Sequence, residues 1–491
     1  MKYLLGIDFG GGASKATLLC ENGDICATAT AEYPTDYPKP GYAEQDPSHW
    51  VEATCKNIAG VLDKSGVSPA DIAAVSLDAA THTAVITDDD FNVIRPAIYW
   101  TDTRSTEEVK FLRENYGEII EKQVLHKADT IWSLPELLWI KNNEPQNWAR
   151  AKKIMFAKDY VRHFFTGDYV TDFIEAEGSM MFDVGKMDWS PELCKVLDID
   201  TKMLPKIVKP TDIVGSITKE AAELTGLSEG TPVLCGTTDT VMEVFASGAV
   251  RKGQMTLKLA TAGRICVVTD KPYPDINLIN YSHIVDNMFY PGTATKSCAA
   301  SYRWFRDTFG GDYGELDEMA EKIAIGSDGL VFHPYLNGEL TPYANPKLCA
   351  DFVGVRASHT KAHFTRAVLE GVAMSMLDCK LALESFDIEH GDSAAIIGGG
   401  GKSPLWRQMI SDALGIKLVE MKHSDSSFGS AMLAGIAVGI FETPEQAVEK
   451  CNKVVSITVP NAENTPKYME LFKRYKAIGK ALEPIYNGEY L

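Results

Sequence analysis

The sequence has few of the features that would tie it to nucleic acid or to a membrane. Lys and Arg number 48 against 67 Asp and Glu, so the formal net charge is −19. Nucleic acid and anionic membrane surfaces both require clustered basic side chains, and this balance argues against either partner. No segment approaches the roughly 18 uninterrupted apolar residues that span a bilayer. The apolar stretch at the N-terminus is also too short for a signal peptide.

A pattern of paired cysteines is also missing. The ten cysteines include no CxxC pair and show no regular spacing. Cys20, Cys26, Cys235 and Cys266 fall in apolar, strand-like runs, where a free thiol behaves as a small hydrophobic side chain. We therefore expect free thiols and a reducing, cytoplasmic compartment.

The length exceeds that of one ordinary domain. The chain has 491 residues, of which 45% are hydrophobic and 23% charged. This is the composition of a globular protein with enough residues for two large lobes. No low-complexity linker marks the boundary between them.

A glycine-rich loop near the start resembles a cradle for phosphate, in the segment LLGIDFGGGASKATLLCENGDICAT (4–28). In dinucleotide-binding and P-loop proteins such a turn leads into a helix whose N-terminus receives the phosphate. Here two short β-rich runs follow instead, joined by Asn22-Gly23, a strong hairpin signal. The loop Gly10–Ser14 is therefore predicted to join two strands of an antiparallel meander. This argues against a Rossmann dehydrogenase.

A similar strand–turn–strand phrase, QMTLKLATAGRICVVTD, occurs at 254–270. Two such openings suggest duplicated lobes that face each other across a cleft, with a boundary near 245–255. Strand–turn–helix patterns at 232–250 and 393–415, together with helical periodicity at 363–386, indicate an α/β protein.

The run GGGGKS (398–403) resembles the end of a P-loop motif. Ile396, however, stands where the first glycine of that motif must be. Two interpretations stay open for these glycines. They form either a turn that lets strand and helix pack closely or a contact to a nucleotide.

Taken together, these motifs resemble the FGGY carbohydrate kinase family, in a layout like that of the xylulokinases. The similarity runs from residue 3 to about residue 440, and its order and spacing are more specific than any one phrase. The matching segments are GIDFGGGASK (6–15), GYAEQDPSHW (41–50), RPAIYWTDTRS (95–105), KDYVRHFFTGDYVTD (158–172), CGTTDTVMEVFASGAV (235–250), PYLNGELTP (334–342), RAVLEGVA (366–373) and GGGGKSPLWRQMISDALG (398–415).

The resemblance implies two actin-like, ribonuclease H-like lobes with a central cleft. The N-terminal lobe, 1–247, would hold the sugar and the catalytic base, and the C-terminal lobe, 248–491, the nucleotide. It also implies transfer of the ATP γ-phosphoryl group, with Mg²⁺ present, to a hydroxyl of a ketose or polyol. A homodimer is the default expectation, because symmetric pairs are the commonest soluble assembly.

The catalytic base is expected at Asp239. A sugar hydroxyl is a poor nucleophile, so phosphoryl transfer needs a carboxylate that accepts its proton. Asp239 lies in the turn TTDT (237–240) and matches the catalytic aspartate of the family. The dipole of the following helix would keep the carboxylate ionised. The alternative is that Asp239 is only a helix N-cap.

The first glycine loop is expected to bind the phosphates. Gly10, Gly11 and Gly12 would let backbone N–H groups approach phosphate oxygens. Asp8 would hold Mg²⁺ through water, unless it only satisfies its own turn. Lys15 corresponds to the basic residue after this loop in the family, although a lone surface lysine is the ordinary alternative.

The second lobe is expected to hold the rest of the nucleotide. Thr261 and Gly263 match the second phosphate loop, and Gly399, Gly400 and Lys402 match the loop on the adenosine side. There the glycines would let the backbone close over the base and the ribose.

The sugar is expected beside the turn that contains Thr81 and His82. His82 matches the family's sugar-contacting histidine, although a histidine between two threonines is more often structural. Asp102 and Arg104 would shape the sugar end of the cleft. Trp100 has two interpretations, a stacking surface for substrate or a core residue.

Several positions depart from the family pattern. Three glycines replace the usual Gly-Thr-Ser of the first loop, and the second loop loses one hydroxyl. ATHT (80–83) replaces Gln-Met-His-Gly, and GELTP (338–342) replaces Gly-Glu-Arg-Thr-Pro. The identity of the sugar therefore stays open, because such sites reject analogues steeply. A competing hypothesis is an actin-like nucleotide-binding regulator or a catalytically lapsed kinase, against which the retained Asp8 and Asp239 count.

Overall fold

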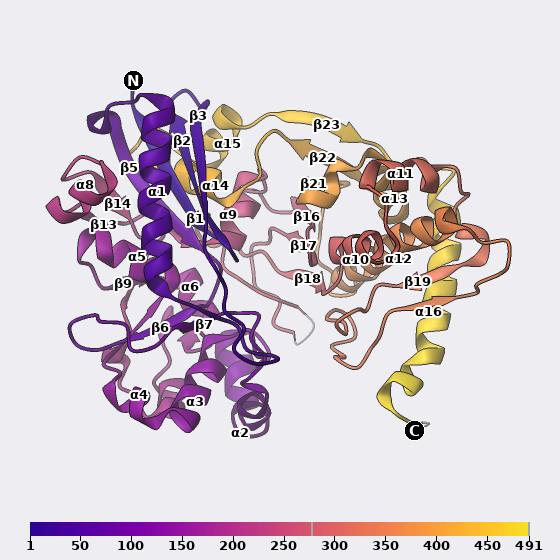
Figure 1. The fold of residues 1–491 in the computed structure, drawn as a ribbon, viewed down its shortest axis with the longest axis horizontal. Helices are drawn as coiled ribbons and strands as arrows, with labels where there is room; N and C mark the ends of the chain where they lie inside the picture. Colours follow the sequence, from indigo (N-terminus) through magenta and orange to yellow (C-terminus); the bar gives the residue numbers. More distant parts are fainter. Residues whose placement is uncertain (276–277, 490–491) are drawn as a thin grey trace. The chain divides into compact units, whose positions relative to one another are not determined.

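Two units make up the chain in the computed structural model, which describes residues 1–275 and 278–489 (Figure 1). The change of unit near residue 250 lies close to the division expected from the sequence, but two later segments return to the first unit. The first unit contains Met1–Val250, Tyr281–Asn287 and His423–Asn452, and the second contains Arg251–Asn280, Met288–Lys422 and Lys453–Leu491.

The first unit is built on a seven-stranded sheet in the order β13-β14-β5-β1-β2-β3, with β15 paired to β5. β1 and β2 are antiparallel, as are β2 and β3, so the predicted meander is confirmed. β5 runs parallel to β1. The strands are β1 (Tyr3–Phe9), β2 (Ala13–Cys20), β3 (Ile25–Glu32), β5 (Ile72–Ala79), β13 (Ile213–Ser216), β14 (Pro232–Leu234) and β15 (Thr237–Thr238).

The second unit repeats this plan with a six-stranded sheet in the order β18-β17-β16-β21-β22-β23. β16, β17 and β18 form an antiparallel meander, and β21 runs parallel to β16. The duplicated plan expected from the two strand–turn–strand phrases is thereby confirmed. The strands are β16 (Met255–Leu259), β17 (Gly263–Val267), β18 (Gly292–Thr295), β21 (Ser393–Ile397), β22 (Lys417–Met421) and β23 (Val454–Thr458).

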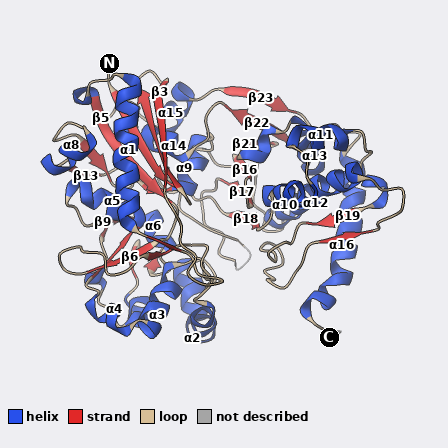
Figure 2. Ribbon diagram, in the orientation of Figure 1, coloured by secondary structure: helices blue, strands red, loops and turns tan. Residues whose placement is uncertain are grey.

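The helices of both units include some that pack on the main sheets and, in the first unit, a group that lies away from its sheet (Figure 2). In the first unit they are α1 (Pro47–Ser65), α2 (Thr106–Val124), α3 (Ser133–Asn143), α4 (Pro145–Arg150), α5 (Ala157–Thr166), α6 (Phe173–Gly178), α7 (Pro191–Cys194), α8 (Lys219–Thr225), α9 (Asp239–Ala246), α14 (Ser426–Ala437) and α15 (Pro444–Cys451). In the second unit they are α10 (Ala299–Phe309), α11 (Tyr313–Glu321), α12 (Lys361–Glu384), α13 (Pro404–Leu414) and α16 (Thr465–Asn487).

Short strand pairs complete the fold outside the main sheets. They are β4 (Glu44–Gln45) with β7 (Ala97–Ile98), β6 (Ala84–Thr87) with β8 (Lys153–Phe156), β9 (Val170–Asp172) with β12 (Lys206–Val208), β10 (Phe182–Asp183) with β11 (Asp188–Trp189), and β19 (Val331–His333) with β20 (Asp351–Val353).

Alternate residues of β1 face helices on opposite sides of the first sheet. Leu5 and Ile7 belong to a core cluster that includes buried residues of α1. On the other face, a Cβ added at Gly6 would lie 1.9 Å from the carbonyl oxygen of Ser427, so α14 packs directly on the strand backbone. Because side chains alternate along a strand, Asp8 shares the α14 face.

Local sequence signals set both ends of α13, and its end at Gly415 lies as predicted. The Ser403 hydroxyl accepts a hydrogen bond from the N–H of Trp406 at 3.1 Å, and Pro404 occupies the first turn. Gly415 ends the helix in the left-handed conformation, with φ +66°. Serine caps and C-terminal glycines satisfy the backbone groups that a helix leaves unpaired at its ends.

The expectation that all cysteines are free thiols is wrong for one pair. Cys20 and Cys26 form a disulfide across the β2–β3 hairpin. The two residues lie six positions apart on the two arms of the hairpin, beside a bulge in the β2–β3 register, and the spacing in the sequence did not signal this proximity. The other eight cysteines form no disulfide within the described residues.

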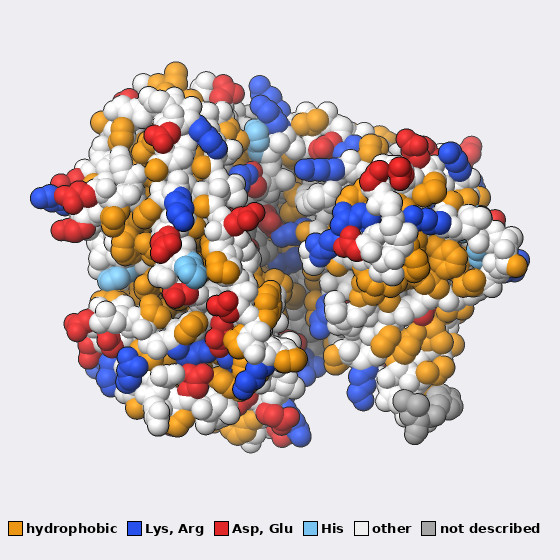
Figure 3. Space-filling view, in the orientation of Figure 1, with side chains coloured by type: hydrophobic (Ala, Val, Ile, Leu, Met, Phe, Trp, Pro, Cys, Tyr) orange, Lys and Arg blue, Asp and Glu red, His pale blue; other side chains and the backbone are white. Residues whose placement is uncertain are grey.

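The surface carries charge of both signs. Acidic and basic side chains are interspersed over the visible faces of both units (Figure 3). Within residues 1–275 and 278–489, no helix is long and apolar enough to cross a bilayer.

Candidate active site

Three acidic side chains come together at one edge of the first unit's sheet. Asp8 lies opposite Asp78 in the parallel pair β1–β5, and Thr237 of β15 lies opposite Asp78 on the other side of β5. Asp239 follows as the first residue of α9. Ligands of α/β proteins bind outside the carboxyl ends of such strands. The strand pairing thus gathers carboxyl groups where a ligand is expected.

The carboxyl groups of Asp8 and Asp78 hydrogen-bond each other. Burial, followed by the charge of Asp239, raises the pKa of Asp8 to about 7. Burial and the charge of Asp8 raise the pKa of Asp78 well above its usual range. Ser430 of α14 donates a hydrogen bond to Oδ2 of Asp78 at 2.5 Å. Because two adjacent carboxylates repel each other, the pair keeps a shared proton near neutral pH.

Asp8 does not merely satisfy its own turn, and that interpretation is wrong. Its buried carboxyl group lies beside Asp78 of β5 and close to Ser426 of α14, both remote in sequence. No group of three or more His, Cys, Asp and Glu side chains in the described part of the chain is spaced to hold a metal ion by itself. A Mg²⁺ ion at Asp8 would therefore need oxygen ligands from phosphate and water.

The Asp239 carboxylate is held by hydroxyl groups. Its Oδ1 accepts hydrogen bonds from Oγ1 of Thr81 and Oγ1 of Thr240, each at 3.1 Å. The residue that caps α9 is Thr238, so the interpretation of Asp239 as only an N-cap is wrong.

The turn before Asp239 is fixed by a glycine and by a buried arginine. Gly236 has φ +70°, and a Cβ there would lie 1.9 Å from the carbonyl oxygen of Leu77. Only glycine fits so close to the backbone in this conformation. Nη1 of Arg162 donates to the carbonyl oxygen of Cys235 at 2.7 Å. Strand β5 and helix α5 therefore set the position of this turn.

His82 lies in the turn after β5 with φ +77°, and its side chain is buried. Its Nε2 is 2.6 Å from the hydroxyl of Tyr281, and its ring centroid is 4.6 Å from that of Trp132. A Cβ added at Gly178 would lie 1.6 Å from Nδ1, so the backbone of α6 abuts the ring. These contacts agree with a structural role for His82, and its contact to sugar stays a prediction.

Asp102 and Arg104 pair with each other inside the first unit. Nη2 of Arg104 lies 2.7 Å from Oδ2 of Asp102, and both side chains are 1% exposed. Arg104 also pairs with Glu44 at 2.7 Å, and the N–H of Ala43 donates to Asp102. The pair fixes the segment before α2. Trp100, in contrast, is 40% exposed, so its interpretation as a core residue is wrong.

The glycine loop between β1 and β2 keeps backbone donors available. The N–H of Gly10 donates to the carbonyl oxygen of Ala13 at 3.0 Å, and the hydroxyl of Tyr33 donates to the carbonyl of Gly10. Among the hydrogen bonds of the described residues, none uses the N–H of Gly11 or Gly12. Both glycines are exposed. Such a row of N–H groups forms a concavity suited to an anion.

Lys15 is not a lone surface residue, and that interpretation is wrong. It lies opposite Asp8 in the β1–β2 pair. Its Nζ is 2.9 Å from Oδ1 of Asp425, which caps α14 by accepting a hydrogen bond from the N–H of Phe428. The lysine thereby joins the edge of the sheet to the start of α14.

The corresponding loop of the second unit is also closed by a short backbone hydrogen bond. The N–H of Ala260 donates to the carbonyl oxygen of Ala262 at 3.2 Å, so this bond spans one residue fewer than the bond from Gly10 to Ala13. Thr261 is exposed, and the hydrogen bonds within the described chain leave its N–H unused. A Cβ at Gly263 would lie 2.6 Å from Sδ of Met376, so Gly263 lets β17 pack against α12.

Two glycines of the run after β21 differ in how closely other atoms surround them. A Cβ at Gly400 would lie 2.9 Å from the ring of Trp406 and 3.0 Å from Leu259, so this glycine permits close packing. A Cβ at Gly399 would meet no atom within 4 Å. Lys402 is exposed at the end of the same 3₁₀ turn. The packing interpretation thus applies to Gly400, and Gly399 borders open space.

Glu339 of the second unit was not among the candidate site residues predicted from the sequence. This buried carboxyl group accepts hydrogen bonds from Oγ1 of Thr295 at 2.6 Å and from the N–H of Lys296 at 2.9 Å. Burial raises its pKa to about 6, against the opposing effect of these bonds. Asp78 was missed as well. Its signal was an aspartate at the end of an apolar run, the position that Asp8 has in β1.

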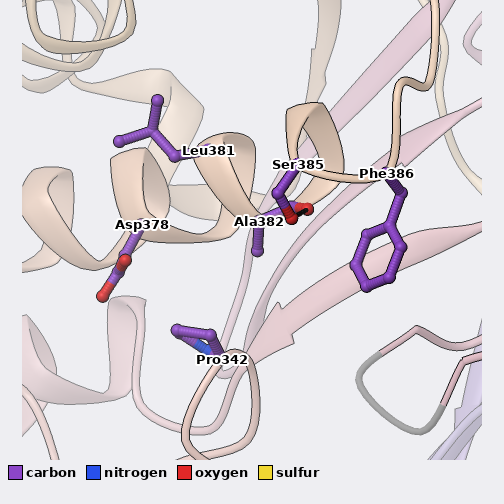
Figure 4. Close-up of a pocket in the computed structure, with 6 residues that line it drawn as sticks. All are labelled: Pro342, Asp378, Leu381, Ala382, Ser385 and Phe386. Carbon is purple, nitrogen blue, oxygen red and sulfur yellow. Dashed lines mark hydrogen bonds between the residues drawn. The ribbon is translucent and has the colours of Figure 1, made fainter.

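A separate hollow of about 270 Å³ lies in the second unit and contains none of the expected site residues. One wall is the last part of α12, which presents Ala382 and Ser385, with Pro342 facing it from a loop (Figure 4). The full lining is Pro342, Asp378, Leu381, Ala382, Ser385 and Phe386.

Family models match most of both units. The N-terminal domain of the FGGY family of carbohydrate kinases matches residues 3–246, and the C-terminal domain matches residues 265–438. The chain belongs to the FGGY family of carbohydrate kinases. The kinase activity implied by the sequence motifs is thereby supported over the whole length of the match.

Curated relatives agree with this assignment. Xylulose kinase of Bacillus subtilis (strain 168) is 32% identical over 484 residues, which cover 97% of each chain. Gluconokinase of the same organism is 28% identical over 500 residues, covering 99% of this chain and 97% of the relative.

Solved structures share the fold. Ligand-bound xylulose kinase from Lactobacillus acidophilus superimposes with a TM-score of 0.93 at 25% identity, covering 99% of this chain and 100% of that one. Gluconate kinase from Lactobacillus acidophilus gives a TM-score of 0.93 at 26% identity, with 99% of both chains covered.

Proposed function

We propose that this carbohydrate kinase transfers the γ-phosphoryl group of ATP to a hydroxyl of a ketose such as xylulose, with Asp239 as the general base. One observation carries the proposal. The Asp239 carboxylate is held by the hydroxyls of Thr81 and Thr240 at the sheet edge where Asp8 and Asp78 also end. The xylulose kinases among the relatives support the choice of sugar.

Asp239 would take the proton of the sugar hydroxyl. As the hydroxyl oxygen bonds to the γ-phosphorus, the bond to the ADP oxygen breaks and the proton moves to the carboxylate. The hydroxyls of Thr81 and Thr240 both bind Oδ1 and so fix the orientation of the carboxyl group. A base held in a single orientation loses little entropy when the reaction occurs.

Mg²⁺ would neutralise the developing charge on the phosphate oxygens when bound. The donor set of the first unit fits this ion, because Mg²⁺ prefers one or two carboxylates together with phosphate and water oxygens. Asp8 and Asp78 supply adjacent carboxyl groups that share a proton. Asp8 would bind the ion, and the cation would replace the positive charge of that proton.

ATP would be contacted by backbone donors in both units. In the first unit these are the N–H groups of Gly11 and Gly12, with Gly10 and Lys15 shaping the loop. In the second unit, Thr261 and Gly263 would serve the phosphate loop. Gly399, Gly400 and Lys402 would serve the adenosine side, where Gly399 borders open space.

The sugar would lie beside Thr81 and His82. The His82 ring is buried against Tyr281 and α6, so its position is well fixed. Asp102 and Arg104 would act indirectly, because they pair with each other and support the neighbouring segment. The hydroxyl of Thr81 stands where xylulokinases carry a methionine, which would change the hydrogen bonds offered to the sugar.

The test measures ADP release with xylulose, other pentuloses, hexuloses, polyols and gluconate. We expect the highest kcat/KM with a pentulose. Asp239→Asn should lower kcat by about 10²- to 10⁴-fold, the usual contribution of a general base. Asp63→Asn, at an exposed position of α1, is the matched control and should leave kcat unchanged.

Two outcomes would contradict the proposal. Full sugar-dependent turnover by Asp239→Asn would remove the base assignment. Nucleotide binding without turnover of any acceptor would favour the catalytically lapsed kinase.

A further inference from the structure

A hydrogen bond connects the start of α6 to the turn that carries Asp239. The side chain of Asp172 caps this helix, because Oδ1 accepts hydrogen bonds from the N–H groups of Ile174 and Glu175 at 3.0 and 3.3 Å. The same oxygen accepts a hydrogen bond from Oγ1 of Thr237 at 2.7 Å. Thr237 is two residues before Asp239. A displacement of Thr237 therefore moves the proposed base.

The same helix is tied to the turn that carries His82. Oε1 of Glu175 accepts a hydrogen bond from the N–H of His82 at 2.9 Å. His82 has φ +77°, a conformation that a non-glycine residue keeps only where its surroundings impose it. Gly178, the last residue of α6, abuts the His82 ring. One short helix thus holds both turns to which the proposed function assigns chemistry.

A buried network of ion pairs includes Asp172, the residue that caps this helix. Nζ of Lys158 lies 2.9 Å from Asp172 and 2.5 Å from Asp159, and all three side chains are fully buried. Arg162 pairs with Asp159 at 2.8 Å and also donates to the carbonyl of Cys235. Removing one partner from such a buried pair leaves an uncompensated charge, so the network resists displacement.

We propose that Asp172 and Glu175 are positioning residues that hold the base and the sugar-facing turn in one geometry. Asp172 acts on Asp239 through the Thr237 hydroxyl, and Glu175 acts on His82 through its backbone N–H. The proposal rests on the proposed roles of Asp239 and His82. It also predicts that the two hydrogen bonds affect different kinetic constants. Loss of the hydrogen bond between Thr237 and Asp172 should lower kcat, and loss of the hydrogen bond between His82 and Glu175 should raise the KM for the sugar.

Substitutions of Thr237 test its hydrogen bond to Asp172. Thr237→Val removes the hydroxyl but keeps the shape of the side chain. It should lower kcat by about tenfold, because a small misplacement of a catalytic group is costly, with both KM values within about twofold. Thr237→Ser restores the donor and should recover most of kcat.

Thr171→Val is the matched control for Thr237→Val. Thr171 precedes Asp172 in β9, and its buried hydroxyl has no hydrogen-bond partner within the described chain. This substitution has the same chemistry in the same region and should leave both kcat and the thermal midpoint unchanged.

Substitutions of Glu175 test the hydrogen bond that it accepts from the N–H of His82. Glu175→Leu removes the acceptor for the His82 N–H and should raise the KM for the sugar by about tenfold, with a smaller effect on kcat. Glu175→Gln keeps an acceptor oxygen. Because burial raises the pKa of Glu175 to about 8, the native side chain is itself neutral near pH 7. The Gln variant should therefore behave like the wild type even if the Leu variant folds poorly.

A double mutant separates this inference from the proposed function. In the Asp239→Asn background, Thr237→Val should have no further effect on kcat, because the hydrogen bond between Thr237 and Asp172 acts through the missing base. An active Asp239→Asn enzyme would remove the proposed base. An inactive Asp239→Asn enzyme with a fully active Thr237→Val enzyme would overturn the inference alone. Equal losses of kcat in Thr237→Val and Thr237→Ser would also overturn it.

Discussion

At the scale of single residues, buried carboxyl groups hold much of the first unit's polar interior together. Asp8 and Asp78 hydrogen-bond each other, and Glu175 binds the backbone of His82. Glu177, also in α6, accepts hydrogen bonds from both the N–H and the hydroxyl of Ser282. Burial removes hydration from each of these groups and favours its neutral form, and this effect outweighs the hydrogen bonds that the group accepts.

The stability of the protein should therefore fall as the pH rises. Burial raises the pKa of Glu177 from 4.5 to about 8. Its contribution is fully present below pH 4.5 and is lost as the pH rises through 8, because ionisation then favours the unfolded chain. Each unit of pKa difference corresponds to about 1.4 kcal/mol.

Glu177→Gln, with an amide that stays neutral, should reduce this loss in urea unfolding measured between pH 5 and pH 8.5. Glu52→Gln, on the exposed face of α1, should leave the pH dependence unchanged. An unaltered pH slope in the Glu177 variant would contradict the expected titration.

At the scale of secondary-structure elements, close backbone approaches decide which residues are tolerated. The last turn of α6 leaves no room for a side chain at Gly178, because a Cβ would overlap the His82 ring. By contrast, a Cβ at Gly117 in α2 would meet no atom within 4 Å. The two helical glycines thus differ only in their surroundings, which makes them a matched pair.

Gly178→Ala should be destabilised by about 1–3 kcal/mol, because the His82 ring must move to accommodate the methyl group. The sugar KM should rise with it. Gly117→Ala should instead be neutral or more stable by up to about 1 kcal/mol, as expected when alanine replaces glycine inside a helix. Urea denaturation and steady-state kinetics measure both effects. Equal stability changes in the two variants would contradict the close approach.

At the scale of the whole molecule, the same α/β plan occurs twice, with a short loop between the first two strands of each meander. In both loops the first residue closes a tight turn, Gly10 onto Ala13 and Ala260 onto Ala262. The second unit adds the glycine run after β21. Because a bound ligand stabilises only the native state, nucleotide binding can be read from the unfolding of the whole protein.

Gly399→Leu tests the nucleotide site of the second unit. Gly399 borders open space, so the substitution should leave the thermal midpoint without ligand nearly unchanged. ADP with Mg²⁺ at 100 times Kd should stabilise the wild type by about 2.7 kcal/mol. The variant should lose most of this stabilisation, because the leucine would occupy the place assigned to the adenosine. Equal stabilisation of both proteins in a thermal shift assay would contradict the assignment of Gly399.

Local patterns in the sequence determined the elements of this protein. The Asn22-Gly23 turn and the helix end at Gly415 each depend on neighbours a few residues away, and both lie as predicted. The family motifs likewise pointed to Asp239. These signals survive without tertiary structure because turns and caps are satisfied by nearby backbone groups.

Only the tertiary structure decided how the candidate site is held together. Parallel pairing of β1 with β5 brings Asp8 to Asp78, and α6 brings Asp172 to Thr237. The fold also leaves Trp100 exposed. Burial and pairing between distant segments set these contacts and the pKa shifts that follow from them. No window of neighbouring residues contains that information, because each partner's environment is created by the fold.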